Sequence, residues 1–121
     1  MDAGQGSKAV TELQKAVSAN HADSEAVGAL GQAYSQKGDR ARAVAQFEKA
    51  IALDPQSDNR GKWDSLLKVN RYWLLIQQGD NALKANKTAQ AERYYQQARN
   101  IDNTDSYAVL GLGDAAAARK D

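Results

Sequence analysis

One pattern of small and large apolar residues recurs along this sequence and constrains its fold more than any other feature. Its small residues stand where two helices must approach closely, and its large apolar residues fill the space between them. The landmarks of the first copy are Leu30, Gly31, Tyr34, Gly38, Asp39, Ala43, Phe47, Ala50 and Pro55. Pro55 should end the second helix, because its ring cannot continue a helix. The pattern predicts a pair of helices over residues 24–57.

Six positions of the first copy, Gly31, Ala43, Phe47, Ala50, Leu53 and Asp54, return further along the chain as Gly79, Ala91, Tyr95, Ala98, Ile101 and Asp102. They predict a second helix pair over residues 72–105. The start of this pair recurs in turn as Val109, Gly113, Asp114 and Ala116, which makes residues 106–121 the first helix of a third pair. Residues 7–20 match the second helix of an earlier pair, through Ala9, Leu13 and Ala16. We therefore expect half, whole, whole and half a unit in a single solenoid over residues 1–121.

The helix-pair unit resembles the tetratricopeptide repeat, whose length is about 34 residues. The resemblance covers nearly the whole chain, and it implies an all-α fold in which helix pairs stack into a right-handed superhelix. Capping residues agree with the expected helix starts: Asp23 or Ser24, Asp39, Asp58 or Asn59, Thr88, and Thr104 or Asp105. Gly38 and Asn86 stand where helices should end.

An extra segment, residues 58–71, separates the two whole units. Trp63, Leu66, Leu67 and Asn70 recur there at helical spacing. We favour one long helix over about residues 59–86, and the alternative is an extra helix that breaks near Asn70. In either case we expect the segment to act as a hinge or to change the direction of the solenoid. The hinge residues would be Arg60, Gly61 and Asn70.

Composition excludes several classes of function. Sixteen basic residues against fifteen acidic ones leave a net charge of +1, too little to attract nucleic acid strongly. The absence of cysteine excludes disulfides and thiol chemistry. The single histidine, His21, has no partners at the spacing of a metal site or a catalytic triad. We expect no enzyme activity, no cofactor and no metal.

The first helix of each unit in such a solenoid lines the concave side, which usually binds ligands. The candidate binding residues on that side are Gln32, Gln36, Trp73, Asp80, Lys84, Tyr107 and Asp114. Trp73 and Tyr107 share one repeat position, and Asp80 and Asp114 share another. Two aromatic rings beside two carboxylates could hold an extended peptide or a sugar chain. The alternative is that both rings pack against neighbouring helices.

Residues 62–79 and 103–114 also strongly resemble the repeat region of the family of bacterial cellulose synthase C subunits. The resemblance implies an interior segment of a much larger periplasmic protein that is anchored by an outer-membrane pore. It also implies a role in cellulose export and biofilm formation, with other cellulose synthase complex proteins as partners.

Two hypotheses follow. We favour a scaffold or adaptor that binds proteins and links the inner-membrane synthase to the outer-membrane pore. The second is a carbohydrate-binding conduit, in which the concave face guides the β-1,4-glucan chain. An unrelated assembly chaperone is a third and weaker hypothesis. We also expect the chain to self-associate through the exposed apolar faces of its end helices.

Overall fold

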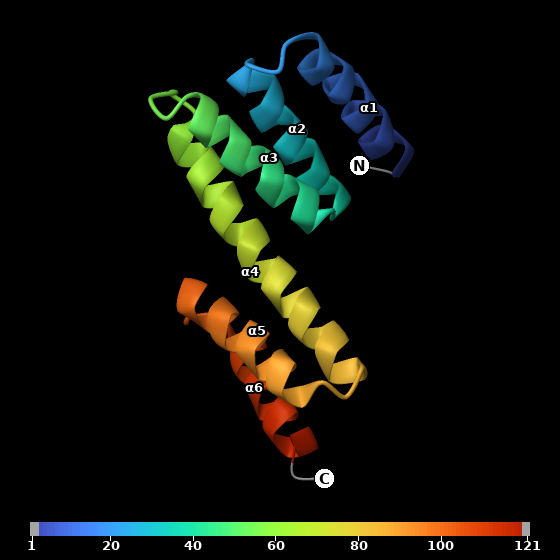
Figure 1. The fold of residues 1–121 in the computed structure, drawn as a ribbon, viewed down its shortest axis with the longest axis vertical. Helices are drawn as coiled ribbons and strands as arrows, with labels where there is room; N and C mark the ends of the chain where they lie inside the picture. Colours follow the sequence, from blue (N-terminus) through green and yellow to red (C-terminus); the bar gives the residue numbers. More distant parts are fainter. Residues whose placement is uncertain (1–2, 120–121) are drawn as a thin grey trace. The chain divides into compact units, whose positions relative to one another are not determined.

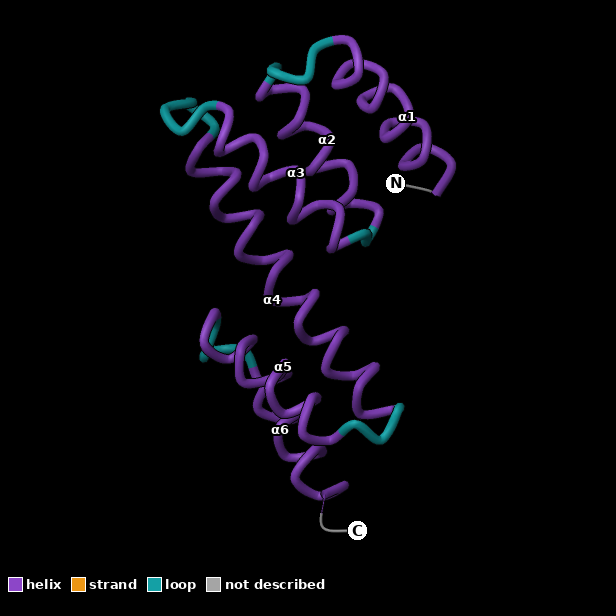
Figure 2. Tube along the Cα trace, viewed as in Figure 1, coloured by secondary structure: helices purple, strands orange, loops and turns teal. Residues whose placement is uncertain are grey.

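The computed structural model of the protein describes residues 3–119, which form six α-helices joined by short turns. The helices are α1 (Ala3–Ala19), α2 (Ser24–Lys37), α3 (Arg40–Leu53), α4 (Arg60–Lys84), α5 (Thr88–Ile101) and α6 (Ser106–Arg119) (Figure 1). Figure 2 shows helix and loop and no strand over the described residues. The all-α prediction is therefore confirmed.

Side-chain caps fix the starts of several helices. The carboxylates of Asp23 and Asp39 accept hydrogen bonds from the backbone N–H three residues later, at 3.1 and 3.2 Å. Asp105 accepts from the N–H of Tyr107 at 2.9 Å. Each bond satisfies a donor that the first helical turn would otherwise leave without a partner. These three predicted caps are confirmed.

The helix ends follow the predicted residues, with one correction at a helix start. Gly38 has a φ of 87° and Asn86 a φ of 61°, the left-handed geometry that terminates helices. The sequence predicts Thr88 as the cap of α5, but Thr88 is the first helical residue. Lys87 takes the cap position and makes no side-chain cap bond. The correction has a simple cause, because the helix starts directly after the turn at Asn86.

The bounds of two helices differ from those that the sequence predicts. Helix α1 begins at Ala3 instead of Ser7, because the apolar pattern that places it starts only at Ala9. Helix α4 runs without a break from Arg60 to Lys84. The favoured prediction of one long helix is therefore confirmed, and the alternative break near Asn70 is wrong.

None of the described helices combines the length and the hydropathy that crossing a membrane requires.

The chain divides into two compact units after Asn70. In the first unit the ring of Phe47 in α3 lies against Gly31 in α2, where an added Cβ would come within 3.0 Å of it. Trp63 lies against Gly28, where any side chain would overlap the indole. The two glycines therefore set how closely the helices of this unit approach.

Asn70 is the buried polar residue of the first unit, with an exposed fraction of 0%. Its amide donates to the Ser35 hydroxyl at 3.1 Å and to the Leu66 carbonyl at 2.7 Å. Its oxygen accepts from the Arg40 guanidinium at 3.1 Å. Because donors and acceptor are all paired, burial of this amide carries no large penalty.

In the second unit, Tyr95 of α5 forms the centre of the core and is 1% exposed. Its ring lies against Gly79 of α4 and Gly111 of α6, where added Cβ atoms would come within 2.6 and 2.5 Å of the ring. Gly79 and Tyr95 are thus the counterparts of Gly31 and Phe47 in the first whole repeat. Both whole repeats use the same contact, a ring of the second helix against a glycine of the first.

Candidate functional site

An exposed aromatic patch is the main candidate site, and it consists of Trp73, Tyr107 and Leu110 in the second unit. The rings of Trp73 and Tyr107 meet edge to face, with centroids 5.2 Å apart and an interplanar angle of 72°. The shared repeat position therefore brings two residues from successive repeats into direct contact. Edge-to-face geometry is favourable for two such rings, because the positive edge of one meets the negative face of the other.

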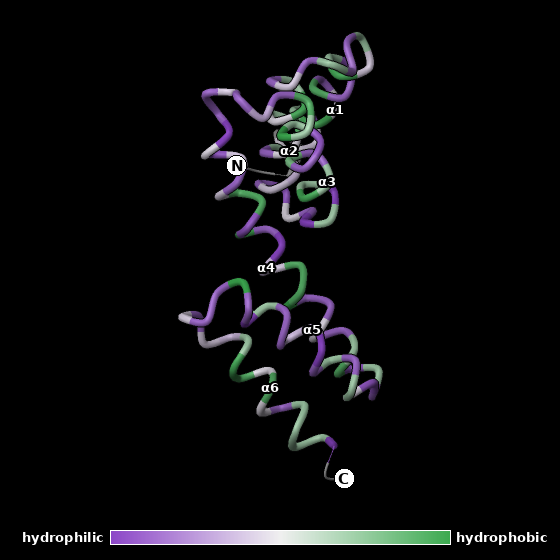
Figure 3. Tube along the Cα trace, turned by 60° about the vertical axis from the view of Figure 1, so that its left-hand side comes forward, coloured by the Kyte–Doolittle hydropathy of each residue, from purple (hydrophilic) through white to green (hydrophobic). Residues whose placement is uncertain are grey.

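Exposure separates Tyr107 and Leu110 from core residues, whereas Trp73 packs against the core of the second unit. Tyr107 is 58% exposed and Leu110 is 62% exposed, whereas Trp73 is half-buried. Tyr107, Leu110 and Asp114 lie three and four residues apart on α6, so they share one face of the helix. In Figure 3 several hydrophobic stretches follow α6. A face that presents large apolar side chains with a carboxylate at its end is suited to binding another molecule.

Tyr72 supports the patch from beneath. Its ring meets Trp73 edge to face at 5.0 Å, and it is only 3% exposed. Burial, and then the nearby Asp105 carboxylate, raise the pKa of Tyr72 to about 12. The hydroxyl therefore stays protonated, and the ring gives Trp73 a neutral and fixed support.

The two carboxylates that share a repeat position have a structural link to the core. The Tyr95 hydroxyl donates to Asp80 Oδ1 at 2.6 Å. Burial first, then this bond and the charges of Asp80 and Asp114, raise the pKa of Tyr95 well above its ordinary value. Asp80 thus anchors the core ring, although both carboxylates are exposed. Sequence reasoning missed this bond, since it assigned the aspartates only to a ligand.

The remaining predicted binding residues lie outside the patch. Gln32 is half-buried and Gln36 is exposed, both on α2 of the first unit. Lys84 is exposed in the last turn of α4. None of these three side chains has a contact that marks it as part of a binding site, and their role stays a prediction.

The predicted hinge residues have defined positions in the first unit. Arg60 donates to Asp64 Oδ2 and to the Pro55 carbonyl, each at 3.1 Å, at the start of α4. Gly61 is exposed in the same turn, and Asn70 is the last residue before the division between the units. A hinge role for them stays a prediction.

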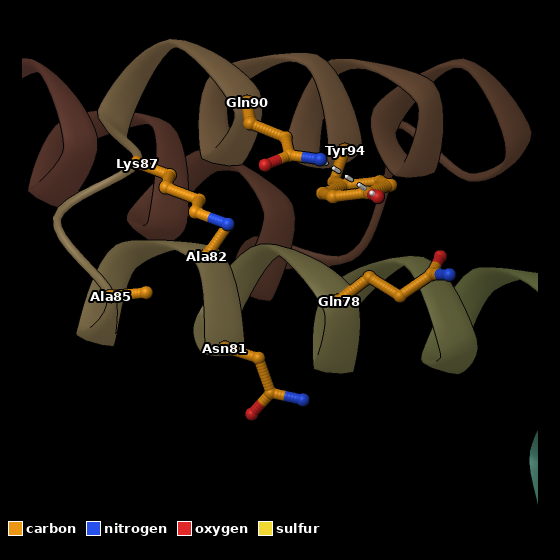
Figure 4. Close-up of a pocket in the computed structure, with 7 residues that line it drawn as sticks. All are labelled: Gln78, Asn81, Ala82, Ala85, Lys87, Gln90 and Tyr94. Carbon is orange, nitrogen blue, oxygen red and sulfur yellow. Dashed lines mark hydrogen bonds between the residues drawn. The ribbon is translucent and has the colours of Figure 1, made fainter.

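Sequence reasoning also missed a shallow pocket between α4 and α5, with a volume of about 260 Å³. Figure 4 shows its lining, which comprises Gln78, Asn81, Ala82, Ala85, Lys87, Gln90 and Tyr94. The Gln90 amide donates to the Tyr94 hydroxyl at 3.4 Å. The carboxamides that line this pocket can donate and accept hydrogen bonds, so they could bind an uncharged polar group. No motif in the sequence marks these residues.

Metal binding finds no support in the described part of the chain. Between residues 3 and 119 no cluster of three or more His, Asp or Glu side chains has a geometry that could hold an ion. The candidate site rests instead on the aromatic patch, in which the Tyr107 ring is exposed and Trp73 is half-buried.

Comparison with known proteins places these features in a family. Two family models, each described as tetratricopeptide repeat, match residues 24–57 and 76–121. The first match coincides with the first whole repeat predicted from the landmarks. Together the two matches leave out the residues before Ser24, the whole extra segment 58–71, and residues 72–75.

Three curated proteins are similar to this chain over 112 residues, which is 93% of it. Cellulose synthase operon protein C of Escherichia coli (strain K12) is 74% identical, as is the putative cellulose synthase operon protein C of Escherichia coli O157:H7. Cellulose synthase operon protein C of Salmonella typhimurium is 77% identical. The chain spans about 10% of the length of each of these relatives.

Proposed function

Because this chain belongs to the tetratricopeptide repeat family, we propose that it is a protein-binding scaffold segment of a bacterial cellulose synthesis and export machine. Repeats of this kind present extended surfaces to other proteins, and their stacked helices act as spacers. In this proposal the segment lies in the periplasm and contributes to the link between the inner-membrane synthase and the outer-membrane pore. It binds other proteins of the complex and catalyses no reaction.

The aromatic patch is the observation that carries the proposal. Aromatic residues are enriched among the residues that contribute most to protein–protein binding, because a large ring buries much area at low entropic cost. Tyr107 and Leu110 expose 58% and 62% of their surface although both have large apolar side chains. Burying that surface against a partner would stabilise the complex by the hydrophobic effect.

Two further observations support the cellulose role. The relatives at 74–77% identity carry the name of the cellulose synthase operon. The resemblance over residues 62–79 includes Trp73, one member of the patch, and the resemblance over residues 103–114 includes Tyr107 and Leu110. We further propose that α4 serves as the predicted hinge, with Arg60 and Gly61 at its start and Asn70 at the division.

A glucan conduit is the second candidate function. The exposed Tyr107 ring beside Trp73 favours it, because aromatic faces stack on the apolar C–H sides of sugar rings. A conduit requires coplanar rings spaced along a groove, whereas these two rings touch at an angle of 72°. In addition, one oxygen of Asp80 is engaged by Tyr95. The geometry of the patch therefore favours the scaffold.

The scaffold proposal is tested by titrating the chain with purified periplasmic domains of the cellulose synthase complex. We expect saturable binding to one of them. Tyr107→Ala and Leu110→Ala should each weaken it by about tenfold, the usual effect of truncating an important interface residue. Val109→Ala is the matched control, since Val109 is 49% exposed on α6 but lies off the face that Tyr107, Leu110 and Asp114 share. No binding to any domain, or an equal loss in Val109→Ala, would contradict the proposal.

A further inference from the structure

The pocket between α4 and α5, which we call the α4–α5 pocket, arises from two changes in the repeat pattern. Leu30 and Tyr34 of the first whole repeat correspond to Gln78 and Ala82 of the second. Leu30 and Tyr34 are 4% and 5% exposed, so they fill the space beside their helix, whereas Gln78 and Ala82 line a hollow of about 260 Å³. All of its lining lies within residues 78–94, and no part of it comes from α1 or α6. The hollow therefore does not depend on where the sequence begins or ends.

The ring of Tyr34 occupies the corresponding place in the first repeat. The Arg42 guanidinium lies over this ring, 6.0 Å from its centroid. Gln90 is the counterpart of Arg42 and lines the α4–α5 pocket, so the pocket lies where the first repeat holds its tyrosine ring. The Tyr34 hydroxyl accepts a hydrogen bond from the Gln14 carboxamide at 2.8 Å. The first repeat thus holds a phenol ring beside a cation, with a carboxamide at its hydroxyl.

The α4–α5 pocket offers the same surroundings to a ring from another molecule. Its apolar base is Ala82, which is 7% exposed. Among the described residues of the lining, Lys87 alone carries a charge, and in Figure 4 its side chain extends toward Ala82. The electron-rich face of an aromatic ring complements such a cation. The half-buried carboxamide of Gln78 can bond a phenol hydroxyl, as the Gln14 carboxamide does in the first repeat.

We propose that the α4–α5 pocket binds a tyrosine side chain of a partner protein, in the place that Tyr34 fills in the first repeat. The ring contacts Ala82 and the Lys87 ammonium, and its hydroxyl bonds the Gln78 carboxamide. An acidic side chain would pair with Lys87 but would leave the apolar surface of Ala82 and Ala85 uncovered. The inference deepens the proposed protein-binding function and rests on it, because the tyrosine comes from a bound protein. The pocket shares no residue with the aromatic patch.

N-acetyltyrosinamide is the probe, because it carries the tyrosine side chain between two peptide groups and no net charge. It is titrated to millimolar concentration into the nitrogen-15-labelled chain and followed by NMR, in which the side-chain amides of Gln78 and Gln90 report on the pocket directly. We expect saturable shifts of both signals. N-acetylphenylalaninamide, which lacks the hydroxyl, should bind more weakly, and N-acetylalaninamide, which lacks the ring, should cause no saturable shift.

Two variants and a matched control locate the binding. Ala82→Tyr supplies the ring from the chain itself, as in the first repeat, and should abolish the shifts. Lys87→Gln removes the cation and should weaken binding by about two- to fivefold. Lys49→Gln makes the same change of charge at an exposed position of α3 outside the pocket and should bind as the unaltered chain does. Because Lys87 is exposed, Lys87→Gln should fold even if Ala82→Tyr does not.

Several results would overturn the inference. They are the absence of saturable shifts, equal affinity in Lys87→Gln and Lys49→Gln, and shifts that persist in a folded Ala82→Tyr. Tighter binding of methyl β-glucoside or of N-acetylglutamate amide would also overturn it and would identify a sugar or an acidic side chain as the ligand.

The probe needs no partner protein, so its result is separable from the titration with periplasmic domains. A domain that binds while the probe causes no shift in the pocket would overturn the inference and leave the scaffold standing. Binding of the probe without binding of any domain would confirm the pocket and contradict the scaffold.

Discussion

Replacing Gly79 by Ala tests whether the ring of the second helix in each repeat requires a glycine on the first. A Cβ at Gly79 would come within 2.6 Å of Tyr95 Cε1, well inside ordinary van der Waals contact. The ring has little freedom to move away, because Gly111 bounds it as well and its hydroxyl is held by Asp80 at 2.6 Å. The substitution therefore overpacks the core of the second unit.

Two opposing effects set the magnitude. Ala has a better helix propensity than Gly by about 1 kcal/mol. Forcing an extra methyl group into a packed core costs about 1–3 kcal/mol, and the confined ring places this case toward the upper end. We therefore expect Gly79→Ala to lower the free energy of unfolding by about 1–2 kcal/mol.

Gly113→Ala is the control for this effect, since it makes the same change in α6 where no atom lies within 4 Å. It should raise the free energy of unfolding by up to about 1 kcal/mol. Urea denaturation followed by circular dichroism compares the two variants at a concentration where the chain is monomeric. If Gly79→Ala were as stable as Gly113→Ala, the proposed contact between ring and glycine would be refuted.

Three further changes have defined expectations. Tyr95→Phe removes the hydrogen bond to Asp80 and should destabilise the second unit by about 1–2 kcal/mol in urea denaturation, whereas an unchanged midpoint would contradict this role. Asn70→Ala leaves the Arg40 guanidinium and the Ser35 hydroxyl without their buried partner, and it should lower the free energy of unfolding by about 1–3 kcal/mol. A decrease of less than half that amount would count against the hydrogen-bond network of Asn70. Burial raises the tyrosine pKa values, to about 12 for Tyr72, so the folded state retains protons that the unfolded state loses above its ordinary pKa of 10. Below pH 10, tyrosine ionisation should therefore leave the free energy of unfolding unchanged, and above pH 10 the free energy of unfolding should fall. The fall should be smaller in Tyr72→Phe than in the unaltered chain. An equal fall with pH in the two proteins would contradict the assignment of the raised pKa to Tyr72.

The repeat register was readable from the sequence because it depends on residue size at fixed spacing. Gly31 and Phe47, and then Gly79 and Tyr95, meet as the landmarks predict. The long helix α4 was also predictable, since no Pro or Gly interrupts the sequence between Gly61 and Gly79. Sequence spacing was less informative at Thr88, because the turn at Asn86 and not a capping side chain determines where α5 begins.

The candidate site could be predicted only in part from the sequence. The shared repeat position of Trp73 and Tyr107 predicted that they lie on the same side of the solenoid, but their edge-to-face contact depends on side-chain rotamers. The bond between Tyr95 and Asp80 was missed because an exposed carboxylate and a core aromatic give no joint sequence signal. The three partners of Asn70 were missed for a similar reason, since they come from three separate segments.

A titration with cello-oligosaccharides, followed by tryptophan fluorescence, tests most directly whether the aromatic patch binds protein or glucan. The chain has two tryptophans, of which Trp63 is 3% exposed and Trp73 is half-buried in the patch, so Trp73 dominates any response to a ligand. A scaffold predicts a flat response up to millimolar sugar. A saturable change that disappears in Tyr107→Ala, which keeps Trp73 as the reporter, would contradict the scaffold and identify the patch as a glucan-binding surface.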